Sequence, residues 1–289
     1  MGKANKDRYI LPVTIVNEIK QAKSNLSIII EGETDYPFFR NMTIHGSCSF
    51  FISAGKENLI GAIELLNKDA EYSKPFIGIV DKDFDAIDSA PKAPTYPDHV
   101  FVTDNHDREL MCLVPHIRER FYCEYFLKKE LKTQEWLEEQ IISDARVFGY
   151  FQLANHREKW GMTTKNPKDE YMNYGKFYDE KLNLLSYDQI AIKINNNHPV
   201  NPFDANVVAQ KMVEIKDNPP SDCDLLNGHQ IGLILIEYMA KYGERKPTYK
   251  HDDVGHDIRM AYTIEDFHST ELYSSLHKYE ESIEHQFLK

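Results

Sequence analysis

Four short apolar runs in the first third of the chain constrain its fold more than any other feature. They are rich in β-branched residues and read LSIIIEG, CSFFISAG, PFIGIVDKD and HVFVTD. Segments of helical length separate them, the clearest being residues 57–67, whose leucines and isoleucines share one helical face. Runs without strict polar alternation predict strands covered on both faces, and alternating strands and helices predict a parallel sheet. We therefore expect a Rossmann-like α/β unit over residues 25 to about 115.

Beyond Pro115 the pattern changes to helical spacing, without a convincing strand. The helical segments are residues 117–130, 133–160, 205–218 with Asp204 as N-cap, 227–245, and a C-terminal stretch from Ile258. A chain of 289 residues exceeds the roughly 100–200 residues of a typical single domain. The sequence therefore predicts an α/β domain over residues 1–115 and a helical C-terminal domain over residues 116–289.

The composition limits the kinds of partner that the chain can attract. Its formal net charge is −12 and its isoelectric point is about 5.5, so no overall field draws it to nucleic acid or to an anionic membrane. A polyanion would have to be held by local lysines and arginines or through metal ions. The four cysteines lack a CxxC or zinc-like spacing. Together with a polar start and no apolar run of about 18 residues, this leads us to expect a cytoplasmic protein.

Acidic residues gather after three of the four apolar runs. They are Glu31 and Asp35 after the first, Asp81, Asp83 and Asp85 after the third, and Asp104 and Glu109 after the fourth. Ligands of open parallel sheets bind at the carboxyl ends of the strands. If the first and third strands are neighbours, as in the strand order 2-1-3-4, we expect these carboxylates to converge on one crevice.

Such a group of carboxylates is costly without a cation, because like charges in a partly desolvated cleft repel by several kcal/mol. Oxygen ligands without histidine or cysteine favour Mg²⁺ or Mn²⁺. In an extended DKDFD segment, Asp81 and Asp83 point to the same side. Metals held in this way suit phosphodiester chemistry, in which Glu31 would hold or relay a proton.

Each of these residues also has a structural interpretation. An isolated acid after a strand is commonly a helix N-cap, and this alternative stays open above all for Asp85 and Asp104. Lys56 follows the glycine turn after the second run, where it is either a phosphate contact or an exposed lysine. His106 and His229 are more often hydrogen-bonded structural residues than general bases.

The EGETD turn, followed about fifty residues later by DKD, resembles the TOPRIM domain of topoisomerases, primases and OLD-type nucleases. The segments SAGKENL, VTDNHDREL, LLNGHQI and RMAYTIEDFHSTELYSSLHKYE resemble TOPRIM-containing bacterial effectors of PARIS-type anti-phage systems. The resemblance implies a TOPRIM α/β catalytic domain followed by helices. It makes Glu31 the TOPRIM glutamate and Lys56 a catalytic phosphate contact. Asp35, Asp81, Asp83 and Glu109 become metal-binding residues.

The same resemblance implies a partner and a substrate. In such systems an ABC-type ATPase restrains the effector, which upon release cuts host RNA, with tRNA as the expected target and Mg²⁺ or Mn²⁺ as the cofactor. We further expect no membrane association and a homodimer in the active state. Two other functions stay open: a non-catalytic TOPRIM scaffold or sensing module, and metal-dependent phosphotransfer on nucleotides.

Overall fold

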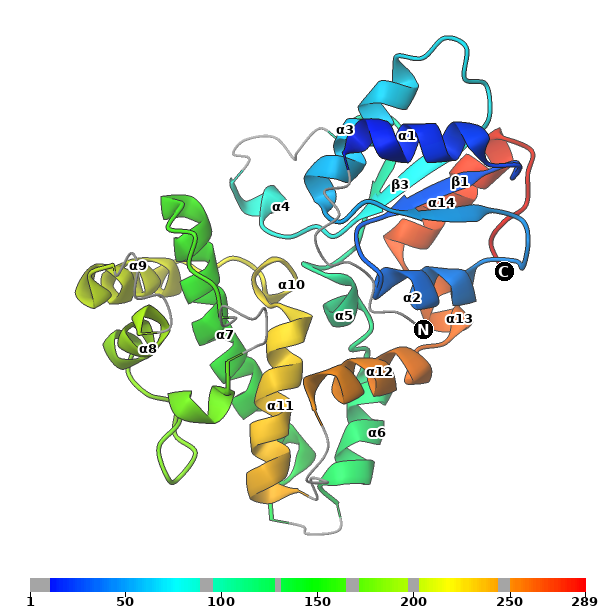
Figure 1. Cartoon of the computed structure of the whole chain (residues 1–289). Helices are drawn as coiled ribbons and strands as arrows, with labels where there is room; N and C mark the ends of the chain where they lie inside the picture. The colour runs from blue at the N-terminus through cyan, green and yellow to red at the C-terminus, as the bar shows by residue number, and fades with distance from the viewer. Residues whose placement is uncertain (1–10, 89–95, 128–130, 165–171, 197–202, 244–249) are drawn as a thin grey trace, which may run out of the picture. The chain divides into compact units, whose positions relative to one another are not determined.

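The chain divides into two compact units. A computed structural model describes residues 11–88, 96–127, 131–164, 172–196, 203–243 and 250–289 (Figure 1). The first unit comprises Met1–Lys82, Lys92–Asp104 and Thr263–Lys289, and the second comprises Asp83–Pro91 and Asn105–Tyr262. The sequence-based division into residues 1–115 and 116–289 differs from this one in two ways: residues 83–91 and 105–115 group with the helical unit, and the end of the chain groups with the α/β unit.

A four-stranded parallel sheet forms the centre of the first unit. Its strands are β1 Ser27–Ile30, β2 Ser49–Ile52, β3 Phe76–Val80 and β4 Val100–Val102. They pair in the order β2-β1-β3-β4, and every pair is parallel. The predicted α/β class, with a parallel sheet in the order 2-1-3-4, is therefore confirmed.

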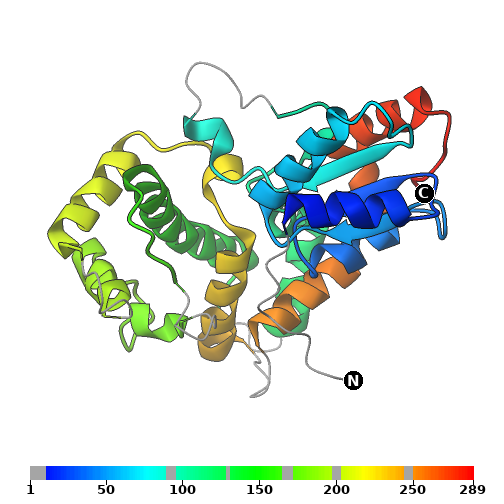
Figure 2. The same ribbon diagram turned by 45° about the horizontal axis from the view of Figure 1, so that its top comes forward.

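Two helices cover one face of this sheet, α1 Pro12–Gln21 and α3 Lys56–Asn67. Figure 2 shows them together on the same side of the strands. Ile19 of α1, Ile63 of α3 and Ile29 of β1 are fully buried in one cluster. Burying a side chain of this size stabilises the fold by roughly 1.5–3 kcal/mol. Of the apolar face predicted for residues 57–67, Leu59, Ile63 and Leu66 are buried in this cluster, whereas Leu65 is 43% exposed and does not belong to it.

The C-terminal residues belong to the opposite side of the same unit, with α2 Asp35–Met42, α13 Ile264–His268 and α14 Glu271–Ser282. The rings of Phe38 in α2 and Phe267 in α13 meet edge to face, 6.3 Å apart between centroids. The hydroxyl of Tyr279 in α14 donates to the carbonyl of Phe76 in β3 at 3.1 Å. The C-terminal segment therefore completes the α/β unit as a layer over its sheet.

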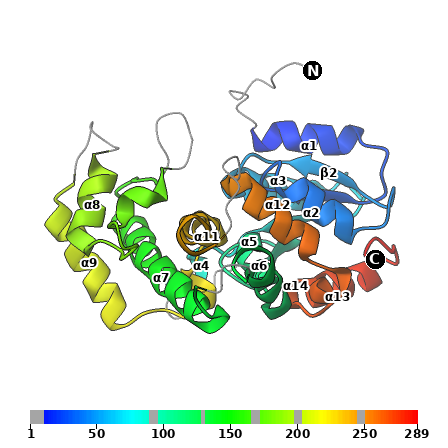
Figure 3. The same ribbon diagram turned by 90° about the horizontal axis from the view of Figure 1, so that it is seen from below.

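The second unit is built from helices in the part of the chain that is described. They are α4 Asp85–Asp88, α5 Arg108–Met111, α6 Pro115–Tyr125, α7 Gln134–Glu158, the 3₁₀ helix η1 Tyr174–Phe177, α8 Tyr187–Asn195, α9 Ala205–Asp217, α10 Asp222–Leu225, α11 Gly228–Tyr242 and α12 His251–Ala261. α9 packs against the 25-residue helix α7, and α8 packs against α9 (Figure 3). Within the described residues, we find no helix whose length and hydropathy suit a membrane span.

Helix α7 is the main packing element of the second unit, and α11 lies along it. Its Asp144 is buried and accepts a 2.9 Å hydrogen bond from the hydroxyl of Tyr238 in α11. At Gly149 of α7 an added Cβ would lie 2.9 Å from the carbonyl oxygen of Leu225, so α10 approaches the α7 backbone closely there. These contacts make the helical unit a packed body with its own core.

Candidate functional site

The carboxyl ends of the strands form one edge of the first unit. Ile30 of β1 pairs with Ile52 of β2 and with Ile79 of β3, so these strands end at the same level. The residues that follow, Glu31 and Asp81 among them, therefore emerge at this edge. This is the edge at which open parallel sheets bind ligands.

Glu31 and Asp81 are joined directly at this edge. The main-chain nitrogen of Asp81 donates a 2.8 Å hydrogen bond to Oε1 of Glu31, and both residues are half-buried. Because β1 and β3 are neighbours, a side chain leaving one strand end reaches the backbone of the other. The structure thus brings these two predicted site residues together.

The turn after β2 is tied to the same place. The Ser53 hydroxyl donates to the carbonyl of Ile30 at 3.0 Å, and the nitrogen of Gly55 donates to the carbonyl of Glu31 at 3.1 Å. Gly55 has a φ of 127°, a conformation that glycine adopts without a steric penalty. The turn holds the start of α3 close to the Glu31 backbone.

Lys56 is the first residue of α3. The positive charge of a lysine at this position is repelled by the partial positive charge of the helix N-terminus, and an anion would relieve this repulsion. A cation and a helix N-terminus beside the strand ends together form a surface that suits a phosphate group.

Asp35 lies at the start of α2 and closes the EGETD turn. Its Oδ2 accepts a 2.8 Å hydrogen bond from the nitrogen of Gly32, and its own nitrogen donates to the carbonyl of Gly32 at 3.2 Å. The carboxylate is therefore folded back over the turn that carries Glu31. Its position is compatible both with a structural role in the turn and with a ligand role.

Asp83 does not follow the extended path expected for DKDFD. Its φ is 50°, in the left-handed region, and its nitrogen donates to the carbonyl of His106 at 2.7 Å. The strand thus ends in a turn before Asp83, and the strand alternation that would aim Asp81 and Asp83 the same way does not extend that far. Asp83 belongs to the second unit, as does Asp85, the first residue of α4.

Asp104 binds a helix N-terminus in the first unit. Its two carboxylate oxygens each accept a 2.8 Å hydrogen bond, Oδ2 from the nitrogen of Glu271 and Oδ1 from that of Leu272. The helix-capping alternative therefore describes Asp104, although the helix is α14 at the far end of the chain. A carboxylate at this position also interacts favourably with the helix dipole.

Glu109 lies in the second unit, within a buried group of charges. It forms an ion pair with its neighbour Arg108, and its Oε2 lies 3.5 Å from Nε2 of His229 at the start of α11. Burial alone would raise the pKa of Glu109, but His229 and Arg108 outweigh it and hold the pKa below its usual value. Glu109 is thus held as a carboxylate by Arg108 and His229, two partners of its own unit.

Asp107 is a buried residue of this group that sequence reasoning did not select. Its Oδ1 accepts from the nitrogen of Leu110 at 2.7 Å, and its Oδ2 accepts from the nitrogen of Gly228 at 2.8 Å. Burial is the larger cause that raises the pKa of Asp107, and the negative charge of Glu109 is the second. The carboxylate joins the first turns of α5 and α11. The available signal was its position as a helix N-cap in the DNHDREL segment.

His106 has a structural environment, as expected. It is buried, its nitrogen donates to the carbonyl of Cys223 at 2.7 Å, and its Nδ1 lies 3.2 Å from the carbonyl oxygen of Asp224. Its ring also packs on Phe84, 4.6 Å between centroids. The contacts with Cys223 and Asp224 tie His106 to α10.

The donor chemistry at the strand ends fits a hard divalent ion. Glu31, Asp35 and Asp81 offer carboxylate oxygens, which Mg²⁺ and Mn²⁺ prefer. These residues fit the ion by ligand type and by their common edge. Their side chains are not gathered into a ready site, since in the described part of the chain no three histidine, cysteine, aspartate or glutamate side chains are arranged to hold a metal.

No protein-family model matches the chain, and a search of curated proteins returns no match.

Proposed function

We propose that the first unit is the catalytic part of a metal-dependent nuclease of the TOPRIM type. The observation that supports this most strongly is the hydrogen bond from the nitrogen of Asp81 to Oε1 of Glu31. It links the glutamate after β1 to the first aspartate of DKD after β3. These are two of the positions at which the TOPRIM resemblance implies acids.

In this proposal each residue at the strand ends has its own role in catalysis. Asp81 and Asp35, both in the first unit, hold Mg²⁺ or Mn²⁺. Such an ion, when bound, neutralises phosphate charge and lowers the pKa of a water. Glu31 holds or relays the proton of the attacking water. Lys56 orients the phosphate.

The biological role that we propose follows the resemblance to AriB-type effectors of PARIS systems. The protein would be toxic when free, cutting host RNA, with tRNA as the preferred substrate. An ABC-type ATPase subunit of the same defence system would restrain it in the cytoplasm. The active form would be a homodimer, because two protomers can grip a folded RNA.

A second candidate function is a non-catalytic TOPRIM scaffold within a defence complex. Hydrogen bonds to the protein's own backbone favour it. Asp35 accepts from Gly32, Glu31 accepts from Asp81, and Asp104 accepts from the first turn of α14. If these carboxylates serve only such contacts, none of them is left for catalysis at the carboxyl ends of the strands.

Expression and cleavage assays separate the two functions. Wild-type protein and Glu31→Ala are induced in bacteria, with Glu33→Ala as the matched control, because Glu33 is an exposed acid of the same turn. The purified proteins are then incubated with tRNA and with double-stranded DNA, in Mg²⁺ or in EDTA. A nuclease is toxic and cuts in Mg²⁺ only, and it loses both properties in Glu31→Ala but not in Glu33→Ala. Equal toxicity of all three proteins, without cleavage, supports the scaffold.

A further inference from the structure

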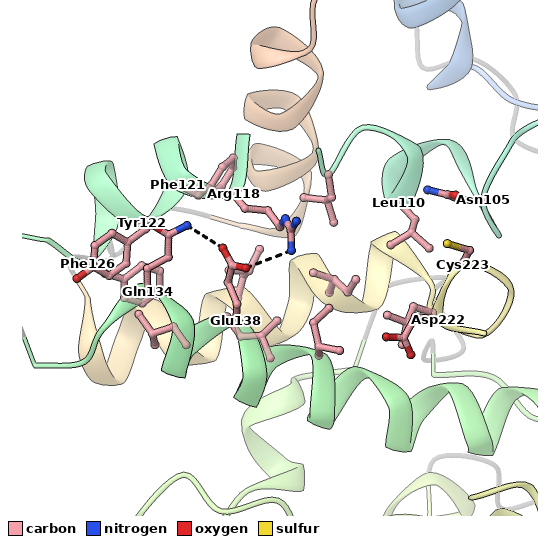
Figure 4. Close-up of a pocket in the computed structure, with 17 residues that line it drawn as sticks. Asn105, Leu110, Arg118, Phe121, Tyr122, Phe126, Gln134, Glu138, Asp222 and Cys223 are labelled. Atoms are coloured by element: carbon pink, nitrogen blue, oxygen red, sulfur yellow. Dashed lines mark hydrogen bonds and ion pairs between the residues drawn. The ribbon is translucent and has the colours of Figure 1, made fainter. Parts of the chain in front are cut away.

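The second unit contains a cavity of about 300 Å³ beside α6, α7 and α11 (Figure 4). All of its lining residues belong to this one unit. Its volume is that of about ten water molecules in the liquid and is at the lower end of the range for small-molecule sites. The strand-end residues Glu31, Asp35 and Asp81 are not among its lining, and the proposed nuclease chemistry does not use it.

Most of the lining is apolar. The aliphatic and aromatic side chains that form it include Leu110, Phe121, Leu137, Ile141, Leu226 and Ile231. A space of this size with such walls offers water few hydrogen bonds, so apolar groups fill it more favourably than water does. The lining therefore selects a ligand with an apolar body.

The charged residues of the lining are neutralised by pairing. Arg118 Nη1 donates to Glu138 Oε2 at 3.1 Å, and Glu138 Oε1 accepts from Gln134 Nε2 at 2.8 Å. Asp222 is held by two hydrogen bonds from Arg146, at 2.8 and 2.7 Å. Because each charge already has an opposite partner, a charged ligand would be desolvated without gaining a counter-ion. The cavity therefore favours a neutral ligand.

One donor remains at the Arg118 end of the cavity. The Nε of Arg118 is buried, and it has no hydrogen-bond partner among the described residues. A buried donor without a partner is costly, and an acceptor on a ligand would satisfy it. The Arg118 and Glu138 side chains are 38% and 32% exposed, so a ligand can reach this end from solvent.

We propose that this cavity binds a neutral amphipathic small molecule. Its apolar body lies among the side chains of α6, α7 and α11, and a hydroxyl or carbonyl oxygen accepts a hydrogen bond from Arg118. This site is independent of the nuclease proposal, because it lies wholly within the helical unit.

The test is displacement of a fluorescent probe. N-phenyl-1-naphthylamine is titrated into the full-length protein, and 1-octanol or octanoate is then added at pH 8, where octanoate is charged. We expect saturable probe binding at one site per chain. 1-Octanol should displace the probe at a concentration at least about tenfold lower than octanoate does, since a buried unpaired charge is strongly disfavoured.

Two substitutions locate the binding. Ile142 lines the cavity and is half-buried, whereas Ile192 in α8 is 46% exposed and lies outside it. Ile142→Trp should weaken probe binding at least about tenfold by filling the space, and Ile192→Trp should leave it unchanged. Circular dichroism and melting temperature verify that both variants are folded.

A third substitution tests the charge argument. Glu138→Gln removes the charged partner of Arg118. The concentration of octanoate that displaces the probe should therefore fall by at least about fivefold relative to that of 1-octanol. The proposal is overturned by probe binding that does not saturate or that survives Ile142→Trp in folded protein. It is likewise overturned if octanoate matches 1-octanol in the wild type, or if Glu138→Gln leaves their ratio unchanged.

Discussion

The main-chain nitrogen of Asp81 donates a 2.8 Å hydrogen bond to Oε1 of Glu31, across fifty residues of sequence. Glu31 therefore has two properties that can be separated by substitution. Its carboxylate oxygen accepts a hydrogen bond that holds two strand ends together, and its carboxylate carries a negative charge. Substitutions that keep one property and remove the other distinguish structure from chemistry.

Glu31→Gln should fold like the wild type, because the amide oxygen can still accept from Asp81. Its free energy of unfolding in urea should differ by less than about 0.5 kcal/mol. Glu31→Ala leaves the half-buried donor without its acceptor and should cost about 1 kcal/mol. Cleavage of tRNA should fall by roughly 10²-fold or more in both. A Gln variant with full activity would show that the charge of Glu31 is not needed.

Asp104→Asn should destabilise the first unit. The substitution removes a negative charge from the N-terminus of α14 and one of two acceptors for the nitrogens of Glu271 and Leu272. We expect a loss of about 1–2 kcal/mol in the free energy of unfolding, measured in urea. Asp98→Asn is the matched control, because Asp98 is exposed in the same unit. Equal stability of the two variants would contradict the helix-capping role.

Gly228→Ala should strongly destabilise the second unit. A Cβ at Gly228 would lie 2.5 Å from Cβ of Glu109 and 2.5 Å from the nitrogen of Leu110, so α5 and α11 would have to separate. The expected cost is about 2–3 kcal/mol by thermal or urea unfolding. Gly255→Ala in α12 is the control, because its Cβ would meet only the flexible end of Arg259, at 3.2 Å. That variant should be unchanged or gain up to about 1 kcal/mol.

Asp144→Asn should alter how stability depends on pH. Burial raises the pKa of Asp144, against the lowering effect of the hydrogen bond from Tyr238. Between the ordinary pKa of an aspartate, about 4, and the raised pKa, folded protein binds more protons than unfolded protein. The free energy of unfolding therefore falls as pH rises through this window. The asparagine side chain does not titrate, and its amide oxygen can still accept from Tyr238.

The measurement is urea unfolding of both proteins at a series of pH values. The stability of the Asn variant relative to the wild type should increase from about pH 4 and level off above the raised pKa. A difference that stays constant with pH, or that decreases, would show that Asp144 does not titrate in this way.

The elements that the sequence predicted well depend on neighbouring residues. The four strands, the α3 helix and the α9 helix with its cap were predicted. The Asp204 side chain does accept from the nitrogen of Asn206, at 2.9 Å. These elements can be predicted because they depend only on the spacing of apolar residues and on a capping residue a few positions away. The neighbouring positions of β1 and β3 were also expected, because they are neighbours in a doubly wound sheet of order 2-1-3-4.

The candidate site was predictable in part. Glu31 and Asp81 were selected from their positions after apolar runs, and the structure places them in contact. The conformation of Asp83 was not predictable, because a φ of 50° depends on the hydrogen bond that its nitrogen makes to His106. The environment of Glu109 also depends on a distant residue, His229.

Sequence alone determined the local elements of this protein and the chemical types of residue at the strand ends. Those follow from side-chain periodicity and from caps, which act over a few residues. Only the tertiary structure decided that Thr263–Lys289 returns to the sheet, that Asp104 binds α14, and that Asp107 joins α5 to α11. These contacts join residues more than a hundred positions apart. They form because a carboxylate removed from water and the backbone N–H groups of a helix's first turn each need a partner, and local sequence does not specify which one is within reach.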